Sequence, residues 1–109
     1  SALESTAEAL SCAGYNILTA ASHTELLAEL QHRRADVIIL DIRMPERDGF
    51  WIAESLRALG NSVPIVFLTG YDSWIYRFYA PFVGSAAYLL KPMEPQALLR
   101  KIEQALRPA

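Results

Sequence analysis

The stretch Val37-Ile38-Ile39-Leu40-Asp41-Ile42-Arg43-Met44-Pro45 decides the fold of this chain. It opens with four consecutive apolar residues, three of them β-branched, a pattern typical of a strand buried on both faces inside a parallel sheet. Asp41 follows directly, at the carboxyl end of the strand, where open α/β sheets place their ligand chemistry. This stretch alone leaves two interpretations open: Asp41 is a nucleophile at the edge of a sheet, or it only caps a turn.

Composition and charge narrow the class of protein. The chain has 109 residues, of which 52% are hydrophobic and 20% charged, so we expect a single domain over residues 1–109. The net charge of −2 gives no reason to expect nucleic acid or an anionic membrane as a partner. The single cysteine cannot form an internal disulfide, and no Cys/His spacing indicates zinc. No apolar run approaches the length of a membrane span, and we expect a cytoplasmic protein.

Helical and strand patterns alternate along the chain. Helices are predicted over 2–13, after the capping-box pair Ser22 and Glu25, over 49–59, over a short aromatic segment near 72–83, and after Pro95. Strands are predicted over 15–20, 37–40, 64–68 and 86–90. The helix over 49–59 is expected to face the core with Phe50, Ile52, Ala53, Leu56 and Leu59. This alternation predicts a parallel sheet covered by helices on both faces.

Three of the predicted strands are followed by a polar residue: Asp41, Thr69 and Lys91. Because right-handed crossovers bring the carboxyl ends of parallel strands to the same edge, we expect these three side chains to converge. A carboxylate, a hydroxyl and an ammonium are the groups that phosphoryl transfer to an acid would use. The acid attacks phosphorus, while the other two hold the equatorial oxygens. The convergence favours the nucleophile interpretation of Asp41.

With these residues in place, the sequence resembles the receiver domain of two-component response regulators. The order and intervals of its motifs match that family over essentially the whole chain. The matching pieces are Asp41 to Pro45 with Asp48-Gly49, Phe67 to Gly70, Gly84, Tyr88, and Leu90-Lys91-Pro92. The resemblance implies a flavodoxin-like, doubly wound parallel sheet with strand order 2-1-3-4-5.

The resemblance also implies a role for each site residue. Asp41 would be the phosphoacceptor, taking a phosphoryl group from a phosphohistidine on a histidine kinase or a histidine phosphotransfer protein. Thr69 and Lys91 would bind the phosphoryl group, and Thr69 together with Tyr88 would form the switch. The domain would assist only its own phosphorylation and dephosphorylation, so it would not be an enzyme. An output domain or effector is implied without being identified.

Mg²⁺ is the cofactor that the resemblance implies, with Asp41 and the main-chain carbonyl of Arg43 among its ligands. The Lys91-Pro92 bond would be cis. The remaining motif residues would shape loops and turns around the site; these are Pro45, Asp48, Gly49, Gly70 and Pro92.

One part of the family pattern is not in the printed sequence. The family has a first strand that ends in an acidic pair holding Mg²⁺, and the printed sequence begins at the helix that follows it. Without that pair, metal binding is expected to be weak, because Mg²⁺ needs several oxygen ligands. Three explanations stay open: a preceding segment is omitted, the flanking strands close up into a four-stranded sheet, or a neighbouring chain supplies the pairing.

Aromatic residues crowd the short helix near 72–83, which Pro81 is expected to cut short. One short helix can hardly bury all of them, so an exposed aromatic patch is predicted that meets a partner or a second copy. The residues of this predicted interface are Trp74, Tyr76, Phe78, Tyr79 and Phe82.

Other functions fit the residues less well or stay as alternatives. A pseudo-receiver, which acts as an interaction or dimerisation module and never takes phosphate, stays open because of the missing acidic pair. A hydrolase of the haloacid-dehalogenase type would need a second acid two residues after Asp41, where this chain has Arg43. No Gly-x-Gly-x-x-Gly follows any strand, which argues against a dinucleotide site.

Overall fold

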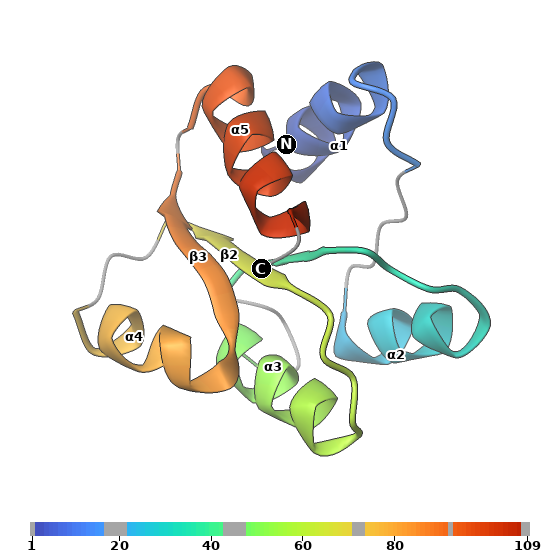
Figure 1. Ribbon diagram of the computed structural model, residues 1–109, viewed down its shortest axis with the longest axis vertical. Coiled ribbons are helices and arrows are strands. Elements are labelled where there is room, and N and C mark those ends of the chain that lie inside the picture. The colour runs from blue at the N-terminus through green and yellow to red at the C-terminus, as the bar shows by residue number, and fades with distance from the viewer. Residues whose placement is uncertain (1, 17–21, 43–47, 71–73, 92, 108–109) are drawn as a thin grey trace.

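Three parallel strands form the sheet, in the order β1 (Ile38–Leu40), β2 (Ile65–Thr69) and β3 (Ser85–Leu90) (Figure 1). They belong to a computed structural model, which describes residues 2–16, 22–42, 48–70, 74–91 and 93–107. In the register of the sheet, Leu40 lies opposite Phe67, and Thr69 lies opposite Leu90. The carboxyl ends of all three strands therefore lie at one edge.

Helices cover both faces of this sheet (Figure 1). One face carries α1 (Ala2–Cys12) and α5 (Pro95–Leu106). The other carries α2 (His23–His32), α3 (Gly49–Ala58), α4 (Trp74–Tyr79) and the short 3-10 helix η1 (Ala80–Val83). The predicted parallel sheet between two helical layers is confirmed.

Side-chain alternation along the strands divides the interior into two cores. Phe67 of β2 packs with Leu40 and with α3 on one face, whereas Val66 and Leu68 pack with α5 on the other. Every residue of β2 is buried, as expected for the central strand of a parallel sheet. The same alternation in β1 sends Ile39 to the α5 side, so the apolar run Val37 to Leu40 is covered on both faces.

Local sequence signals explain where several helices begin and end. The Ser22 hydroxyl accepts a hydrogen bond from the main-chain N–H of Glu25 (3.2 Å), which caps the first turn of α2. Pro81 lies in the first turn of η1 and cannot continue the α-helical hydrogen bonding of α4, because it has no N–H. The chain therefore tightens into the 3-10 turn, and the prediction that Pro81 shortens this helix is confirmed.

Two sequence predictions, the inward position of Leu59 and the strand over 15–20, are not confirmed. Leu59 does not reach the core: it follows the last turn of α3 as its C-cap and is 71% exposed, so its predicted inward position is wrong. The strand predicted over 15–20 falls mainly on residues outside the described part of the chain, and Tyr15 and Asn16 are not in a strand. Among the described residues, no helix is both long enough and apolar enough to cross a bilayer.

Candidate functional site

Asp41 and Lys91 meet at the carboxyl edge of the sheet. The Lys91 ammonium donates a hydrogen bond from Nζ to Oδ2 of Asp41 at 2.8 Å. The two side chains are 31% and 33% exposed, so solvent and small solutes can reach the pair. A carboxylate in this setting can act as a nucleophile, with the neighbouring ammonium offsetting the negative charge that arrives with a phosphoryl group.

Thr69 ends the central strand β2, between the two strands that Asp41 and Lys91 follow. Its side chain is fully buried, and its carbonyl accepts a hydrogen bond from the main-chain N–H of Lys91 at 2.8 Å. This bond continues the pairing of β2 with β3 by one residue and fixes where the Lys91 side chain leaves the sheet. The structure thus brings together the carboxyl ends that carry Asp41, Thr69 and Lys91, as the order of elements predicted.

Helix α3 starts directly beneath Asp41. The Gly49 N–H donates to the carbonyl of Ile42 at 2.8 Å, and a Cβ built on Gly49 would lie 2.5 Å from the carbonyl oxygen of Asp41. Only glycine permits this approach of two main chains. Asp48 caps the helix, because its Oδ1 accepts from the N–H of Trp51 at 2.8 Å. The turn role predicted for Asp48 and Gly49 therefore has a structural basis.

Tyr88 lies two residues before the end of β3. Its ring is partly buried, 6.1 Å from the ring of Phe67, and the Arg77 guanidinium lies 5.2 Å above its centroid. The contact with Arg77 is a cation–π interaction between α4 and β3. Sequence reasoning singled out Tyr88 and missed Arg77, because nothing in the sequence indicates which side of a six-residue helix faces the sheet.

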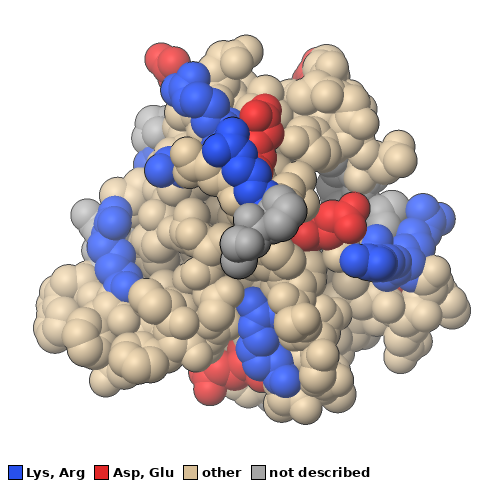
Figure 2. Space-filling view, in the orientation of Figure 1, with Lys and Arg blue, Asp and Glu red and all other residues tan. Residues whose placement is uncertain are grey.

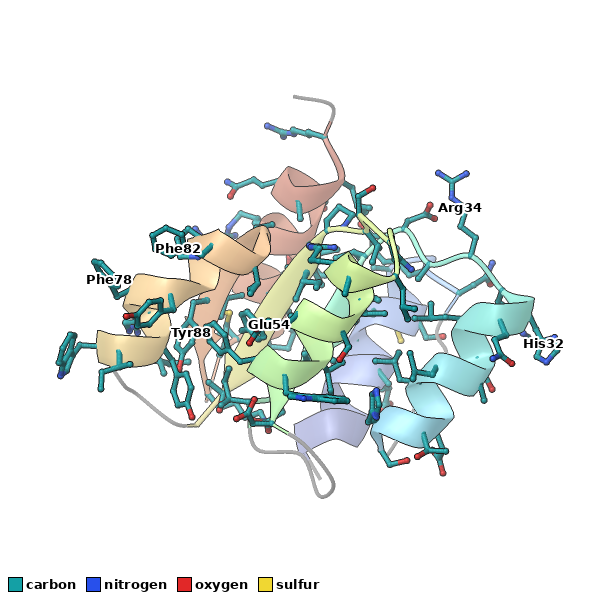
Figure 3. All side chains as sticks on the ribbon, turned by 90° about the horizontal axis from the view of Figure 1, so that it is seen from below. His32, Arg34, Glu54, Phe78, Phe82 and Tyr88 are labelled. Atoms are coloured by element: carbon teal, nitrogen blue, oxygen red, sulfur yellow. The ribbon has the colours of Figure 1, made fainter. Side chains whose placement is uncertain are left out.

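The predicted aromatic patch is exposed in large part. Trp74 and Phe82 are 77% and 76% exposed, and Phe78 and Tyr79 are also more than half exposed. Figure 3 shows Phe78 and Phe82 projecting from α4 and η1, and in Figure 2 the surface over α4 carries little charge. Tyr76 differs, because its ring stacks on Phe50 at 5.1 Å and packs against the core.

Arg57 is a further residue that the sequence did not reveal. Its guanidinium donates to the carbonyls of Val83 (2.8 Å), Asn61 (3.0 Å), Val63 (2.7 Å) and Gly84 (3.0 Å). It thereby ties the end of α3 to the turn between η1 and β3. Burial lowers the pKa of the Arg57 guanidinium from its ordinary value.

Gly84 completes this turn. It has a left-handed φ of 72°, which favours glycine, and a Cβ there would come within 3.2 Å of Arg57 Nε. The contact explains why a glycine suits this position of the motif.

The described residues do not by themselves make a Mg²⁺ site. Among them no group of three or more His, Cys, Asp or Glu side chains comes together. At this edge of the sheet, the described residues offer a metal ion the carboxylate of Asp41. Mg²⁺ takes six oxygen ligands in near-octahedral geometry. The predicted ligand Arg43 and the turn residue Pro45 lie outside the described residues, as do Pro92 and the predicted cis bond. Gly70 is described and exposed.

Known proteins resemble this chain in sequence and in structure. The response regulator MprA of Mycobacterium sp. (strain KMS) is 35% identical over 95% of this chain and 45% of its own length, so the chain spans just under half of that relative. A CheY-like response regulator receiver domain protein from Methanospirillum hungatei JF-1 matches with a TM-score of 0.88 at 31% identity, covering 95% of this chain and 83% of that one.

The chemotaxis response regulator CheY4 of Vibrio cholerae gives a TM-score of 0.85 at 34% identity, over 94% of this chain and 88% of that one. These likenesses confirm the predicted flavodoxin-like α/β fold. The sequence model described as the response regulator receiver domain matches residues 1–103. The chain therefore belongs to the response regulator receiver domain family of two-component systems.

Proposed function

We propose that this receiver domain is a phosphoacceptor switch, in which Asp41 takes a phosphoryl group from the phosphohistidine of a kinase or a phosphotransfer protein. The observation that carries the proposal is the 2.8 Å contact between Lys91 Nζ and Asp41 Oδ2. It supports the proposal because it places a cation beside a solvent-accessible carboxylate at the edge where Thr69 also ends its strand.

In the proposed reaction, a carboxylate oxygen of Asp41 attacks phosphorus and forms an O–P bond. The P–N bond to the donor imidazole breaks, and the imidazole nitrogen keeps the electron pair. The acyl phosphate carries more negative charge than the carboxylate, and the Lys91 ammonium offsets the difference. The Thr69 hydroxyl donates a hydrogen bond to a phosphoryl oxygen, and Tyr88 is the second switch residue.

The consequence is a shift between two conformations of the domain. The surface that changes comprises α4, β3 and α5, and it communicates with an output domain, an effector or a second copy. Mg²⁺ is the cofactor in this proposal, and it requires oxygen ligands beyond Asp41 and the Arg43 carbonyl. We also propose a cytoplasmic location and no enzymatic activity on a separate substrate.

Phosphorylation of the purified chain by acetyl phosphate, with and without Mg²⁺, tests the proposal. Intact-mass spectrometry should show one added phosphoryl group, which Asp41→Asn abolishes. Asp36→Asn, which removes an exposed acid elsewhere, should be labelled like the parent chain. No Asp41-dependent labelling with several small donors would contradict the switch and support the pseudo-receiver, a module that binds partners without phosphate.

A further inference from the structure

A groove of about 550 Å³ separates α3 from the segment formed by α4 and η1. We call it the α3–α4 groove. Its apolar side includes Ile75, Tyr79 and Phe82, and buried Phe50 contributes to its floor. Among the described residues, Asp41, Lys91 and the Arg77–Tyr88 pair are not part of its lining. It is thus a surface separate from the carboxylate site.

The floor and the far end of the groove are held rigidly. The Phe50 ring stacks between the rings of Phe67 and Tyr76, with centroids 5.1 Å away in each case. At the end of the groove, Arg57 binds the carbonyl oxygens of Val83 and Gly84. A preformed groove loses little conformational entropy when it binds a ligand, which favours binding.

The aromatic rings along the rim of the groove are largely exposed, so they do not serve to fill the core. Phe82 is 76% exposed and Tyr79 53%. Together with Phe78 they form a ring cluster, with centroid separations of 5.2 to 6.0 Å. Clustered exposed aromatic rings are typical of surfaces that bind other proteins.

In the part of the chain that the structure describes, two charged side chains line the groove, Arg57 and Glu54, and only the carboxylate of Glu54 is open to pair with a ligand. The Arg57 guanidinium directs its donors at four main-chain carbonyls, so it has little hydrogen-bonding capacity left for a ligand. Glu54 lies one helical turn earlier on α3, is exposed, and lines the groove (Figure 3). It forms no ion pair with any residue of the described part of the chain. A carboxylate beside aromatic faces is suited to a lysine or arginine side chain.

We propose that the α3–α4 groove binds a segment of a partner protein that presents apolar side chains around a lysine or arginine. The aromatic rings cover the apolar part of the segment, and the Glu54 carboxylate pairs with its cation. A second copy of this chain fits less well, because a two-fold dimer that joined two such grooves would oppose the Glu54 carboxylates of both copies. The proposal does not depend on the phosphorylation of Asp41.

Two labelled peptides test this proposal. The first is a fluorescein-labelled amphipathic helix of about 20 residues, with leucines on one face around a central lysine. The second has glutamate in place of that lysine. Fluorescence anisotropy should show about fivefold tighter binding of the lysine peptide to the parent chain. Glu54→Gln should remove this preference and Glu54→Lys should reverse it, whereas Phe82→Ala should weaken the binding of both peptides about fivefold or more.

Matched controls separate the groove from the general surface. Glu103→Gln removes an exposed acid on α5, and Trp74→Ala removes a ring that is 77% exposed and does not line the groove. Both variants should bind the peptides like the parent chain. Since Glu54 and Phe82 are exposed, their variants should have the same urea midpoint of unfolding as the parent chain. Equal midpoints would exclude misfolding as the cause of weaker binding.

Three results would overturn the proposal. The first is equal affinity of the parent chain for the lysine and glutamate peptides. The second is no binding of either peptide up to about 1 mM. The third is sedimentation velocity that reveals a dimer which Phe82→Ala dissociates, because the groove would then be occupied by a second copy.

Discussion

The Lys91 ammonium lies 2.8 Å from Oδ2 of Asp41, although 50 residues separate the two in the chain. Both side chains are about one third exposed, so the pair is partly screened by solvent and contributes at most about 1 kcal/mol to stability. The pair therefore contributes little to folding, and its position at the edge of the sheet fits the chemistry proposed for Asp41.

Replacing Lys91 with Met tests this separation of roles. Under the proposed function, the rate of Asp41 phosphorylation by acetyl phosphate should fall about 100-fold, because no cation then offsets the developing charge. The free energy of unfolding in urea should change by no more than about 1 kcal/mol. Lys101→Met, at an exposed position of α5, is the control and should keep the parent rate. If the Lys91→Met chain were labelled at the parent rate, Lys91 would have no role in the proposed reaction.

The Gly49→Ala substitution should destabilise the domain by about 2–3 kcal/mol. Its Cβ would lie 2.5 Å from the Asp41 carbonyl oxygen, so β1 and α3 must move apart. Gly70→Ala is the matched control, because a Cβ there meets nothing within 4 Å and its φ is not positive. That substitution should be neutral or stabilising by up to about 1 kcal/mol. Equal urea midpoints for the two variants would contradict the close approach at Gly49.

Removing the Arg57 guanidinium should cost about 2–3 kcal/mol in the free energy of unfolding, because several partly buried carbonyls lose their donor. Arg57→Met is the informative variant, since it keeps the length of the apolar stem. Arg57→Lys should recover less than half of the loss, because an ammonium cannot reproduce the planar arrangement of donors. Arg100→Met, on the exposed side of α5, should stay within about 0.5 kcal/mol of the parent.

A double-mutant cycle measures the contact between Arg77 and Tyr88. With Arg77→Met, Tyr88→Leu and the double variant, the coupling free energy should be about 0.5–1 kcal/mol and stabilising, as expected for a guanidinium over a partly exposed ring. The same cycle with Arg100→Met in place of Arg77→Met should give no coupling beyond about 0.3 kcal/mol. Equal coupling in both cycles would show that the Arg77–Tyr88 contact is not formed in solution.

The sequence predicts the site because the site follows from topology. Asp41, Thr69 and Lys91 each come at the end of an apolar strand, and parallel strands joined by helices bring such ends to one edge. The cap at Asp48 is equally local, since acceptor and donor are three residues apart. These features need only the order of the elements and the residues at their ends.

Other features depend on contacts that no local pattern encodes. The carbonyls that Arg57 binds come from two separate loops, and their convergence depends on how α3 packs beside η1. In the same way, α4 is too short to reveal by periodicity that Tyr76 packs inward while Tyr79 stays exposed. At Leu59 the local pattern gives a wrong prediction. Leu59 continues the apolar spacing of α3, but the helix has already ended at Ala58.

The close approach of Gly49 to the main chain of Asp41 gives α3 a second role. Helix α3 begins against the residue that is proposed to take the phosphoryl group, and its next turn carries Glu54 into the α3–α4 groove. A displacement of the Asp41 main chain would therefore push on the first turn of α3, the helix that forms one wall of that groove. By thermodynamic reciprocity, a ligand that favoured one position of α3 would then also shift the phosphorylation equilibrium of Asp41.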